Sequence, residues 1–162
     1  MAAARIVVLD TGPLSLVTHP KGGPDAEAAK EWLRELREAG VDVRVPEIAD
    51  YELRRELVRA GKTRSVGRLD RLAETPAYLP LTTEAMRLAA EYWAQVRRVG
   101  RPTAPAEALD GDAILAAQAA LLDREEEAAA GVVIATTNVG HLARFPVAAE
   151  EWGAIMPAEG SS

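Results

Sequence analysis

Cysteine is absent from this chain of 162 residues, and histidine occurs only twice, at His19 and His141. Without cysteine, the chain can form neither disulfide bonds nor zinc–thiolate sites. Two histidines are also too few for an all-histidine metal site. A metal bound by this protein must therefore have oxygen ligands, which favours magnesium or manganese.

Long apolar runs are also missing. No stretch reaches the roughly 18 apolar residues that a membrane-spanning helix needs. The apolar run near the start contains Arg5 and ends at Asp10, so it does not have the pattern of a signal peptide. We therefore expect a cytoplasmic protein with no membrane association. The length favours a single domain over residues 1–157, followed by a C-terminal tail at 158–162.

Positive charge is in the minority, since 19 lysine and arginine residues stand against 25 acidic residues, for a net charge of −6. This balance argues against nonspecific nucleic-acid binding. The stretch 54–71 differs, because it holds seven basic residues and two acidic ones. Such a run is either a solvated helical face or a surface that binds phosphates. The candidates for RNA binding within it are Arg54, Arg55, Arg59, Lys62 and Arg64.

Two continuous aliphatic segments, 6–9 and 131–135, indicate strands that are buried on both faces. Strands of this kind belong to parallel sheets with helices on each side. Between them, segments with helical spacing of apolar residues alternate with shorter strand-like segments. The sequence therefore predicts an α/β fold: a three-layer α/β/α sandwich around a central parallel sheet of about five strands.

The remaining elements follow from periodicity and from glycine and proline. Further strands are predicted at 41–45, at 78–81 and near 154–156. Thr11, Gly12 and Pro13 are expected to turn the chain away from the first strand, and residues 100–108 to form an ordered loop or lid. Helices are predicted at about 25–39, 46–60, 62–74 and 82–98, from 110 onward, and as a short turn at 142–145.

Polar groups follow the two most buried strands. Asp10 ends the first strand, and Thr136 to Asn138 follow the other. Ligands in open α/β sheets bind beyond the carboxyl ends of the strands, and strands buried this deeply are expected to be neighbours. Their ends should therefore share one crevice. Alternatively, Asp10 only starts an Asx-turn, in which its side chain bonds the backbone two residues on.

Two further positions carry acids. Glu52 lies on the border of the apolar stripe of its helix, which favours partial burial over an exposed ion pair with Arg55. Asp110 and Asp112 lie where we expect an alanine-rich helix to begin, and either of them could cap it.

Asp10, Glu52 and Asp112 would repel one another if they converged, and each would raise the pKa of the others unless a cation lay between them. Mg²⁺ suits such a set of oxygens. It can generate a hydroxide nucleophile and stabilise the charge on a phosphodiester under attack. This is the chemistry of a metal-dependent nuclease.

Four blocks of the sequence carry a recognisable pattern: Val8–Thr11, Val45–Leu53, Gly111–Ala119 and Ile134–Leu142. With these blocks the chain resembles the PIN-domain ribonucleases, in particular the VapC toxins of bacterial toxin–antitoxin pairs. The resemblance implies a parallel sheet in the order 3-2-1-4-5, Mg²⁺ or Mn²⁺, cleavage of single-stranded RNA, a homodimer and a small antitoxin partner. It gives catalytic and metal-binding roles to Asp10, Glu52 and Asp112; Glu52, and not Glu47, matches because it stands six residues after Pro46.

One position departs from the family. Many members carry a fourth acid three residues after the asparagine, and His141 stands there in this chain. We expect Thr136 to hold Asp10 by a hydrogen bond. Asn138 or Asp110 would substitute in part for the missing acid, and His141 would contact substrate or neighbouring residues, because imidazole suits these hard cations poorly. The alternative is a PIN-like domain that binds RNA or a protein without cleaving it.

Overall fold

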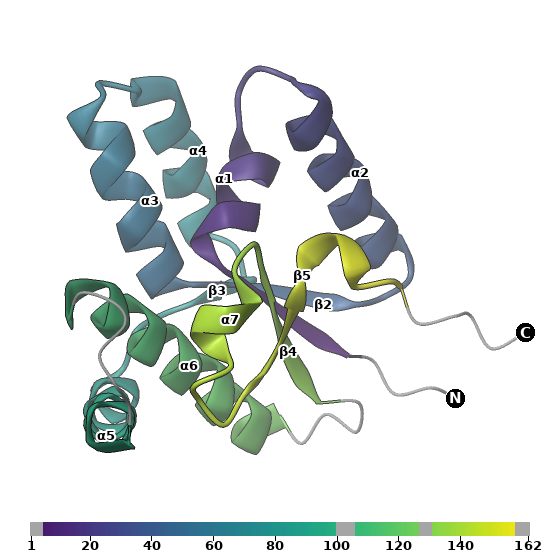
Figure 1. Ribbon diagram of the computed structural model, residues 1–162. Helices are drawn as coiled ribbons and strands as arrows, with labels where there is room; N and C mark the ends of the chain where they lie inside the picture. Colours follow the sequence, from purple (N-terminus) through teal and green to yellow (C-terminus); the bar gives the residue numbers. More distant parts are fainter. Residues whose placement is uncertain (1–4, 100–105, 127–130, 158–162) are drawn as a thin grey trace, which may run out of the picture.

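The computed structural model describes residues 5–99, 106–126 and 131–157 (Figure 1). Its five strands and seven α-helices alternate along the chain, and a short 3₁₀ helix follows the last strand. The elements are β1 (Ile6–Leu9), α1 (Thr11–Thr18), α2 (Pro24–Glu38), β2 (Asp42–Pro46), α3 (Glu47–Arg59), α4 (Thr63–Ala73), β3 (Tyr78–Leu79), α5 (Thr83–Val99), α6 (Ala106–Glu126), β4 (Val132–Thr136), α7 (Val139–Leu142), β5 (Ala148–Glu151) and the 3₁₀ helix η1 (Trp152–Ala154).

All five strands form one sheet in the order β3-β2-β1-β4-β5, and every neighbouring pair is parallel. The strand β1 is central: Ile6 is in register with Asp42 of β2 on one side and with Val132 of β4 on the other. The carboxyl ends of β1, β2 and β4 therefore lie at the same edge of the sheet. The predicted parallel sheet and its strand order are confirmed.

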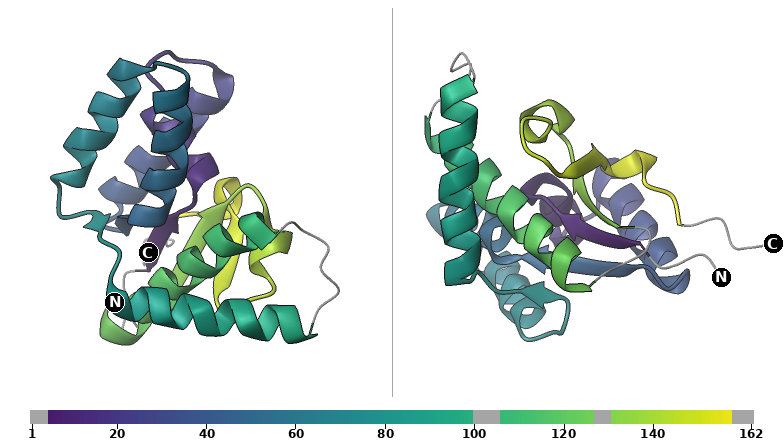
Figure 2. Two further views of the ribbon diagram at one scale, coloured as in Figure 1. Left: turned by 90° about the vertical axis from the view of Figure 1, so that its left-hand side faces the viewer. Right: turned by 90° about the horizontal axis from the view of Figure 1, so that it is seen from below.

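Helices cover both faces of the sheet. On one side lie α1, α2, α3 and α4, and on the other lie α5 and α6, with α5 crossing the outside of α6 (Figures 1 and 2). Side chains of β1 alternate between the two cores: Val7 and Leu9 pack toward α1, α2 and α3, whereas Ile6 and Val8 pack toward α5 and α6. A strand with a core on each face needs apolar residues at every position, which explains the unbroken aliphatic run.

The turn predicted at Thr11 to Pro13 is wrong, because these residues open the helix α1. Asp10 is its N-cap, and its side chain accepts a hydrogen bond from the backbone N–H of Thr11. Pro13 is tolerated in the first turn, where no helical partner exists for its missing N–H. Gly12 and Pro13 favour a turn in the sequence, and the helix is too short to show a clear apolar period.

The helix α6 begins at Ala106, so the prediction that it starts at Asp110 is wrong. Asp110 and Asp112 therefore lie beyond its first residues, and neither is the N-cap. The predicted loop at 100–108 is also wrong for residues 106–108, which are helical. Its remaining part, residues 100–105, lies outside the described residues, as does the predicted tail at 158–162.

The last strand also differs from the prediction at 154–156. It is β5, at Ala148–Glu151, and Trp152–Ala154 form η1 instead. An edge strand paired only with β4 does not need an aliphatic run, so its sequence does not reveal it. The buried side chain of Ile155 produced the wrong assignment, since it packs into the core on the α2 side and its carbonyl accepts a hydrogen bond from the Trp32 indole. The short helical turn likewise lies earlier than predicted, at Val139–Leu142.

Among the described helices, none is both long and apolar enough to cross a membrane.

Candidate active site

Asp10 lies at the carboxyl end of the central strand and is held from two sides. Its Oδ1 accepts the backbone N–H of Thr11 at 2.7 Å, and its Oδ2 accepts the hydroxyl of Thr136 at 2.7 Å. Thr136 is fully buried at the end of β4, and its Oγ1 also accepts the backbone N–H of Asn138. The expected hydrogen bond between Thr136 and Asp10 is therefore present. One carboxylate oxygen caps α1, and the other is fixed by the neighbouring strand.

Glu52 approaches from α3. Its Oε1 accepts the hydroxyl of Thr11 at 3.1 Å, and its Oε2 lies 4.0 Å from the guanidinium of Arg55. The side chain is 28% exposed, in agreement with the expected partial burial. Burial raises the pKa of Glu52, and the charges of Asp10 and Asp112 raise it further, against the opposing effects of Thr11 and Arg55.

Asp112 comes from α6 and is 20% exposed. Its Oδ2 lies 3.3 Å from a guanidinium nitrogen of Arg144 and 3.8 Å from Nδ1 of His141. Burial raises the pKa of Asp112, and the charge of Asp10 raises it further; His141 and Arg144 oppose this shift. Asp112 thus has the guanidinium of Arg144 as a neighbour and also feels the charge of Asp10.

The three acids converge although 102 residues separate the first from the last. Asp10 raises the pKa of both Glu52 and Asp112, so the three carboxylates lie within electrostatic reach of one another. A direct contact brings α6 against Glu52: a Cβ added to Gly111 would lie 2.7 Å from Oε2 of Glu52. Because Gly111 has no side chain, the Glu52 carboxylate can lie this close to the backbone of α6.

The PIN domain family matches residues 7–140 of the chain, which is most of its length. This chain belongs to the PIN domain family. The match includes the three acids together with Thr136 and Asn138, so the predicted resemblance is confirmed. No curated protein matches the sequence.

Solved structures share the fold at low sequence identity. The crystal structure of FitAcB from Neisseria gonorrhoeae has a TM-score of 0.61 and 20% identity, covering 92% of this chain and 99% of that one. VapBC2 from Rickettsia felis, bound to a DNA fragment from their promoter, has a TM-score of 0.61 and 13% identity, with coverage of 91% and 98%. DNA-bound VapBC from Salmonella typhimurium has a TM-score of 0.56 and 21% identity, with coverage of 90% and 97%.

The auxiliary residues of this PIN domain are arranged unequally. His141 lies beside Asp112, and its Nδ1 is 3.2 Å from the side-chain amide of Asn138. Asp110 is exposed, and its side chain makes no hydrogen bond or ion pair within the described parts of the chain. The geometry thus places His141 beside Asp112 and Asn138 beside His141, and it shows no such contact for Asp110 among the described residues.

Arg144 is the site residue that the sequence analysis missed. It lies two residues past the end of α7, and its Nε donates to the backbone carbonyl of His141 at 3.0 Å while another nitrogen reaches Asp112. Its guanidinium also lies 5.9 Å from the centre of the Phe145 ring. No local pattern in the sequence points to Arg144, because its contact with Asp112 joins positions that are 32 residues apart.

The predicted RNA-binding residues separate into two groups. Arg54 pairs with the buried Asp50 at 2.9 Å and with Asp70 at 2.5 Å, so it links α3 to α4. Arg59 pairs with Glu56, and Arg55 lies over the ring of Tyr51 and beside Glu52. By contrast, Lys62 and Arg64 make no ion pair with any described residue.

The three carboxylates are oxygen ligands, which hard cations such as Mg²⁺ prefer. Within the described ranges, no group of three or more acidic or histidine side chains could hold a metal ion as they stand. Magnesium, however, is usually bound by one or two carboxylates and keeps several of its waters. The acids here supply oxygen ligands only. Burial is the main cause of the raised pKa of Glu52 and Asp112, and a cation among the acids would offset both this burial and the smaller repulsion between them.

We predict that Gly111→Ala displaces the Glu52 carboxylate and weakens metal binding. The new methyl group would lie too close to Oε2, and the flexible end of Glu52 would have to move. We expect the affinity for Mn²⁺, measured by calorimetry, to fall about tenfold, as when a group that supports a metal ligand is altered. Gly67→Ala is the control, because a Cβ there meets nothing within 4 Å. An Mn²⁺ affinity for Gly111→Ala equal to that of this control would contradict the prediction.

We predict that Glu52→Gln stabilises the metal-free protein at pH 7. The pKa of Glu52 in the folded state is raised above its ordinary value of 4.5, so its charged form opposes folding at neutral pH. This cost disappears as the pH falls through the folded-state pKa, and the advantage of glutamine disappears with it. Thermal unfolding in chelator at pH 7 and pH 4 measures the difference; the exposed Glu56→Gln, one helical turn further, is the control. Equal melting temperatures of Glu52→Gln and the unaltered protein at pH 7 would show that the charge carries no such cost.

Proposed function

We propose that this chain is a metal-dependent endoribonuclease that cleaves phosphodiester bonds of single-stranded RNA, and that it is the toxin of a toxin–antitoxin pair. The observation that carries the proposal is the convergence of Asp10, Glu52 and Asp112 at the carboxyl ends of the central strands of a PIN domain. Half-buried acids with raised pKa values in a shared crevice are typical of functional sites.

Asp10 and Asp112 would hold Mg²⁺ or Mn²⁺, with Glu52 as a further ligand or as the base that positions a water molecule. When bound, such an ion supplies a hydroxide nucleophile and stabilises the negative charge on the phosphodiester. The chain itself fixes the ligands: Thr136 and the N–H of Thr11 orient Asp10, and the hydroxyl of Thr11 orients Glu52. These bonds limit the rearrangement that the acids undergo when a metal enters.

The raised pKa of Glu52 favours a role as proton acceptor, since a general base works best with a pKa near the working pH. Arg144 has a different role in the proposal. Its guanidinium is held by the carbonyl of His141 at the border of the acid cluster, and it gives a phosphate group a cationic neighbour beside Asp112. Without that cation, three carboxylates would repel an anionic substrate.

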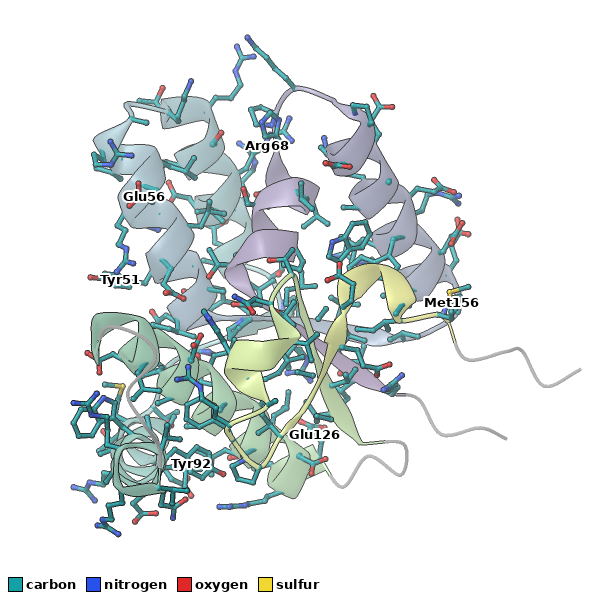
Figure 3. All side chains as sticks on the ribbon, viewed as in Figure 1. Tyr51, Glu56, Arg68, Tyr92, Glu126 and Met156 are labelled. Carbon is teal, nitrogen blue, oxygen red and sulfur yellow. The ribbon has the colours of Figure 1, made fainter. Side chains whose placement is uncertain are left out.

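The proposed partners are the RNA substrate, an antitoxin protein and a second copy of the chain. The antitoxin is supported by the likeness in fold to FitAcB, VapBC2 and VapBC. The homodimer is proposed from the resemblance to the PIN-domain toxins, and an exposed aromatic side chain that a second copy could cover is Tyr51 of α3, which points outward in Figure 3 and is 57% exposed.

We predict that the purified protein cleaves single-stranded RNA in the presence of Mg²⁺ or Mn²⁺ and that chelator abolishes the activity. Asp10→Asn and Asp112→Asn should each lower the rate by at least about a hundredfold, because each removes a charged ligand of the metal. A gel assay with matched single-stranded RNA, double-stranded RNA and single-stranded DNA measures the rate and the substrate class. The control is Glu56→Gln, an exposed acid of α3 paired with Arg59, which should retain the full rate.

Cleavage that survives Asp10→Asn would overturn this mechanism. The alternative function is that of a PIN domain that binds RNA or protein without cleaving, and the observation that favours it is His141 at the position of the fourth acid. Lack of cleavage of any RNA, together with lack of Mn²⁺ binding by calorimetry, would support that alternative.

We predict that induced expression of the chain arrests the growth of a bacterial host and that Asp10→Asn expression does not. Co-expression of a small protein encoded by a short neighbouring reading frame should restore growth, because an antitoxin would block the nuclease. Growth curves with matched protein levels, checked by immunoblot, measure the effect. Arrest by Asp10→Asn as strong as that by the unaltered chain would show that the toxicity does not come from the proposed nuclease.

A further inference from the structure

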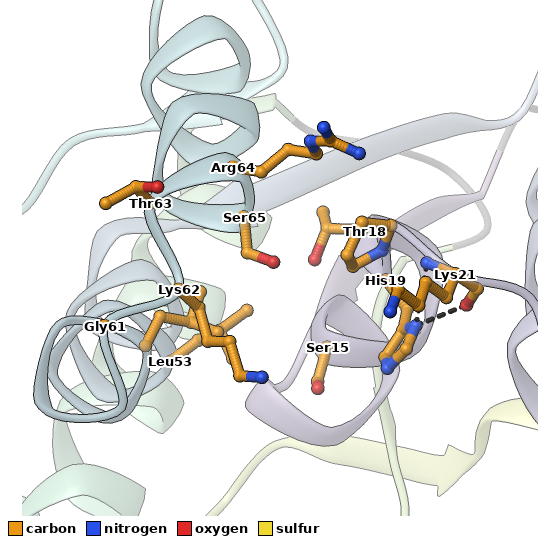
Figure 4. A pocket seen from close by; sticks show the side chains of 12 residues that line it. Ser15, Thr18, His19, Lys21, Leu53, Gly61, Lys62, Thr63, Arg64 and Ser65 are labelled. Atoms are coloured by element: carbon orange, nitrogen blue, oxygen red, sulfur yellow. Dashed lines mark hydrogen bonds between the residues drawn. The ribbon is translucent and has the colours of Figure 1, made fainter.

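A pocket of about 470 Å³ lies between the end of α1 and the start of α4 (Figure 4). Its polar lining is unusual in composition, since it consists of hydroxyl and basic groups and includes no carboxylate. The hydroxyl groups belong to Ser15, Thr18, Thr63 and Ser65, and the basic side chains to His19, Lys21, Lys62 and Arg64. In a chain with 25 acidic and 19 basic residues, such a lining makes a local site of positive potential.

The cations of the pocket are available to a ligand. Lys21, Lys62 and Arg64 make no ion pair within the described part of the chain, whereas Arg54 and Arg59 on α3 are paired with acids. A free lysine or arginine retains its full charge toward an incoming anion. Of the basic stretch 54–71, Lys62 and Arg64 line the pocket, so their charges can attract an anionic ligand there.

Two features supply directed hydrogen-bond donors. The helix α4 begins at Thr63 without a side-chain cap, so its N-terminal end carries partial positive charge, and within the described ranges only the N–H of Thr63 in its first turn has a backbone partner outside the helix, the carbonyl of Gly61. Ser65 in that turn is only 7% exposed, and its hydroxyl, which points toward the pocket in Figure 4, makes no hydrogen bond among the described residues. The hydroxyl oxygen opens into the pocket and has no partner within the described residues, so it is free to donate a hydrogen bond to a ligand there.

The pocket and the acid cluster lie along the same pair of helices. Ser15 of the pocket stands one turn after Thr11 on α1, and Leu53 follows Glu52 on α3. From Thr11 to the pocket residue Thr18 the helix rises about 10 Å, at 1.5 Å per residue. A single strand of nucleic acid can therefore reach both places.

We propose that this pocket binds a backbone phosphate of the RNA strand at a short distance from the scissile bond. Lys62 and Arg64 form the ionic contacts, and Ser65 with the first turn of α4 donates hydrogen bonds. The apolar side chains of Leu53 and Leu57, which also line the pocket, offer a surface to the adjoining ribose or base. The inference rests on the proposed ribonuclease function and adds the path of the substrate, from the acids along α1 to α4. Contacts of this kind increase affinity without reading sequence.

The test measures RNA binding in chelator, where the proposed cleavage cannot occur. Fluorescence anisotropy with a labelled single-stranded RNA of about twelve nucleotides, a common site size, gives the Kd. We expect the double variant Lys62→Ala/Arg64→Ala to raise the Kd about tenfold and to reduce the salt slope by about 0.7 to 1.4, the effect of one to two lost phosphate contacts. Ser65→Ala should weaken binding less and leave the salt slope unchanged.

The matched control removes the same charge elsewhere. Arg87 and Arg98 are exposed on α5, on the opposite side of the sheet, and Arg87→Ala/Arg98→Ala should change the Kd less than twofold. Circular dichroism confirms that both double variants are folded. A Lys62→Ala/Arg64→Ala variant that binds RNA as this control does would overturn the pocket proposal, as would a protein partner that occupies the pocket while RNA binding is unaffected.

Cleavage assays separate this proposal from the nuclease proposal. The double variant should cleave a dinucleotide, which is too short to reach the pocket, at the rate of the unaltered protein, and the longer RNA more slowly at subsaturating concentration. If no metal supports cleavage and the variant still loses RNA binding, the pocket stands and the nuclease proposal fails. If cleavage occurs and the variant matches the unaltered protein on both substrates, the nuclease proposal stands and the pocket fails.

Discussion

The position of β1 between β2 and β4 is the constraint on which the site depends. Its side chains enter both cores, so a shift by one residue would exchange every side chain between the two faces. The backbone N–H of Asp10 bonds the carbonyl of Ala135, and the hydroxyl of Thr136 bonds its carboxylate. The register of β1 with β4 therefore fixes both the backbone and the carboxylate of Asp10. Helices α3 and α6 then bring Glu52 and Asp112 toward a point already defined by the sheet.

The acid cluster opposes folding in the absence of a cation. Glu52 and Asp112 are raised in pKa chiefly by burial, and the charge of Asp10 increases the effect. The surrounding contacts offset this cost only in part: Thr11 bonds Glu52, and Arg144 lies beside Asp112. A fold selected for stability alone would place apolar groups at these positions. The presence of these acids in a half-buried crevice agrees with the binding of a cation, which would offset their mutual repulsion.

The basic residues have different roles according to their partners, which the net charge of −6 does not reveal. Arg54 stabilises the arrangement of α3 and α4, since it joins the buried Asp50 to Asp70. Arg144 lies beside Asp112 at the border of the acid cluster. Lys62 and Arg64 make no ion pair with any residue that the structure describes, and they line the pocket at the start of α4. The role of each basic residue therefore depends on whether its helix places it beside an acidic side chain.

The sequence by itself determined the parallel α/β sandwich, because burial on two faces requires unbroken aliphatic runs. It predicted Asp10 as a site residue because sites follow strand ends, whereas Glu52 and Asp112 were predicted through the family resemblance. It did not reveal the short helix α1, whose start resembles a turn, or the edge strand β5, which needs no apolar run. Only the tertiary structure decided the contact of Gly111 with Glu52, the place of Arg144 and the basic pocket. Each depends on side chains from segments distant in sequence, and periodicity carries no information about which distant side chains will meet.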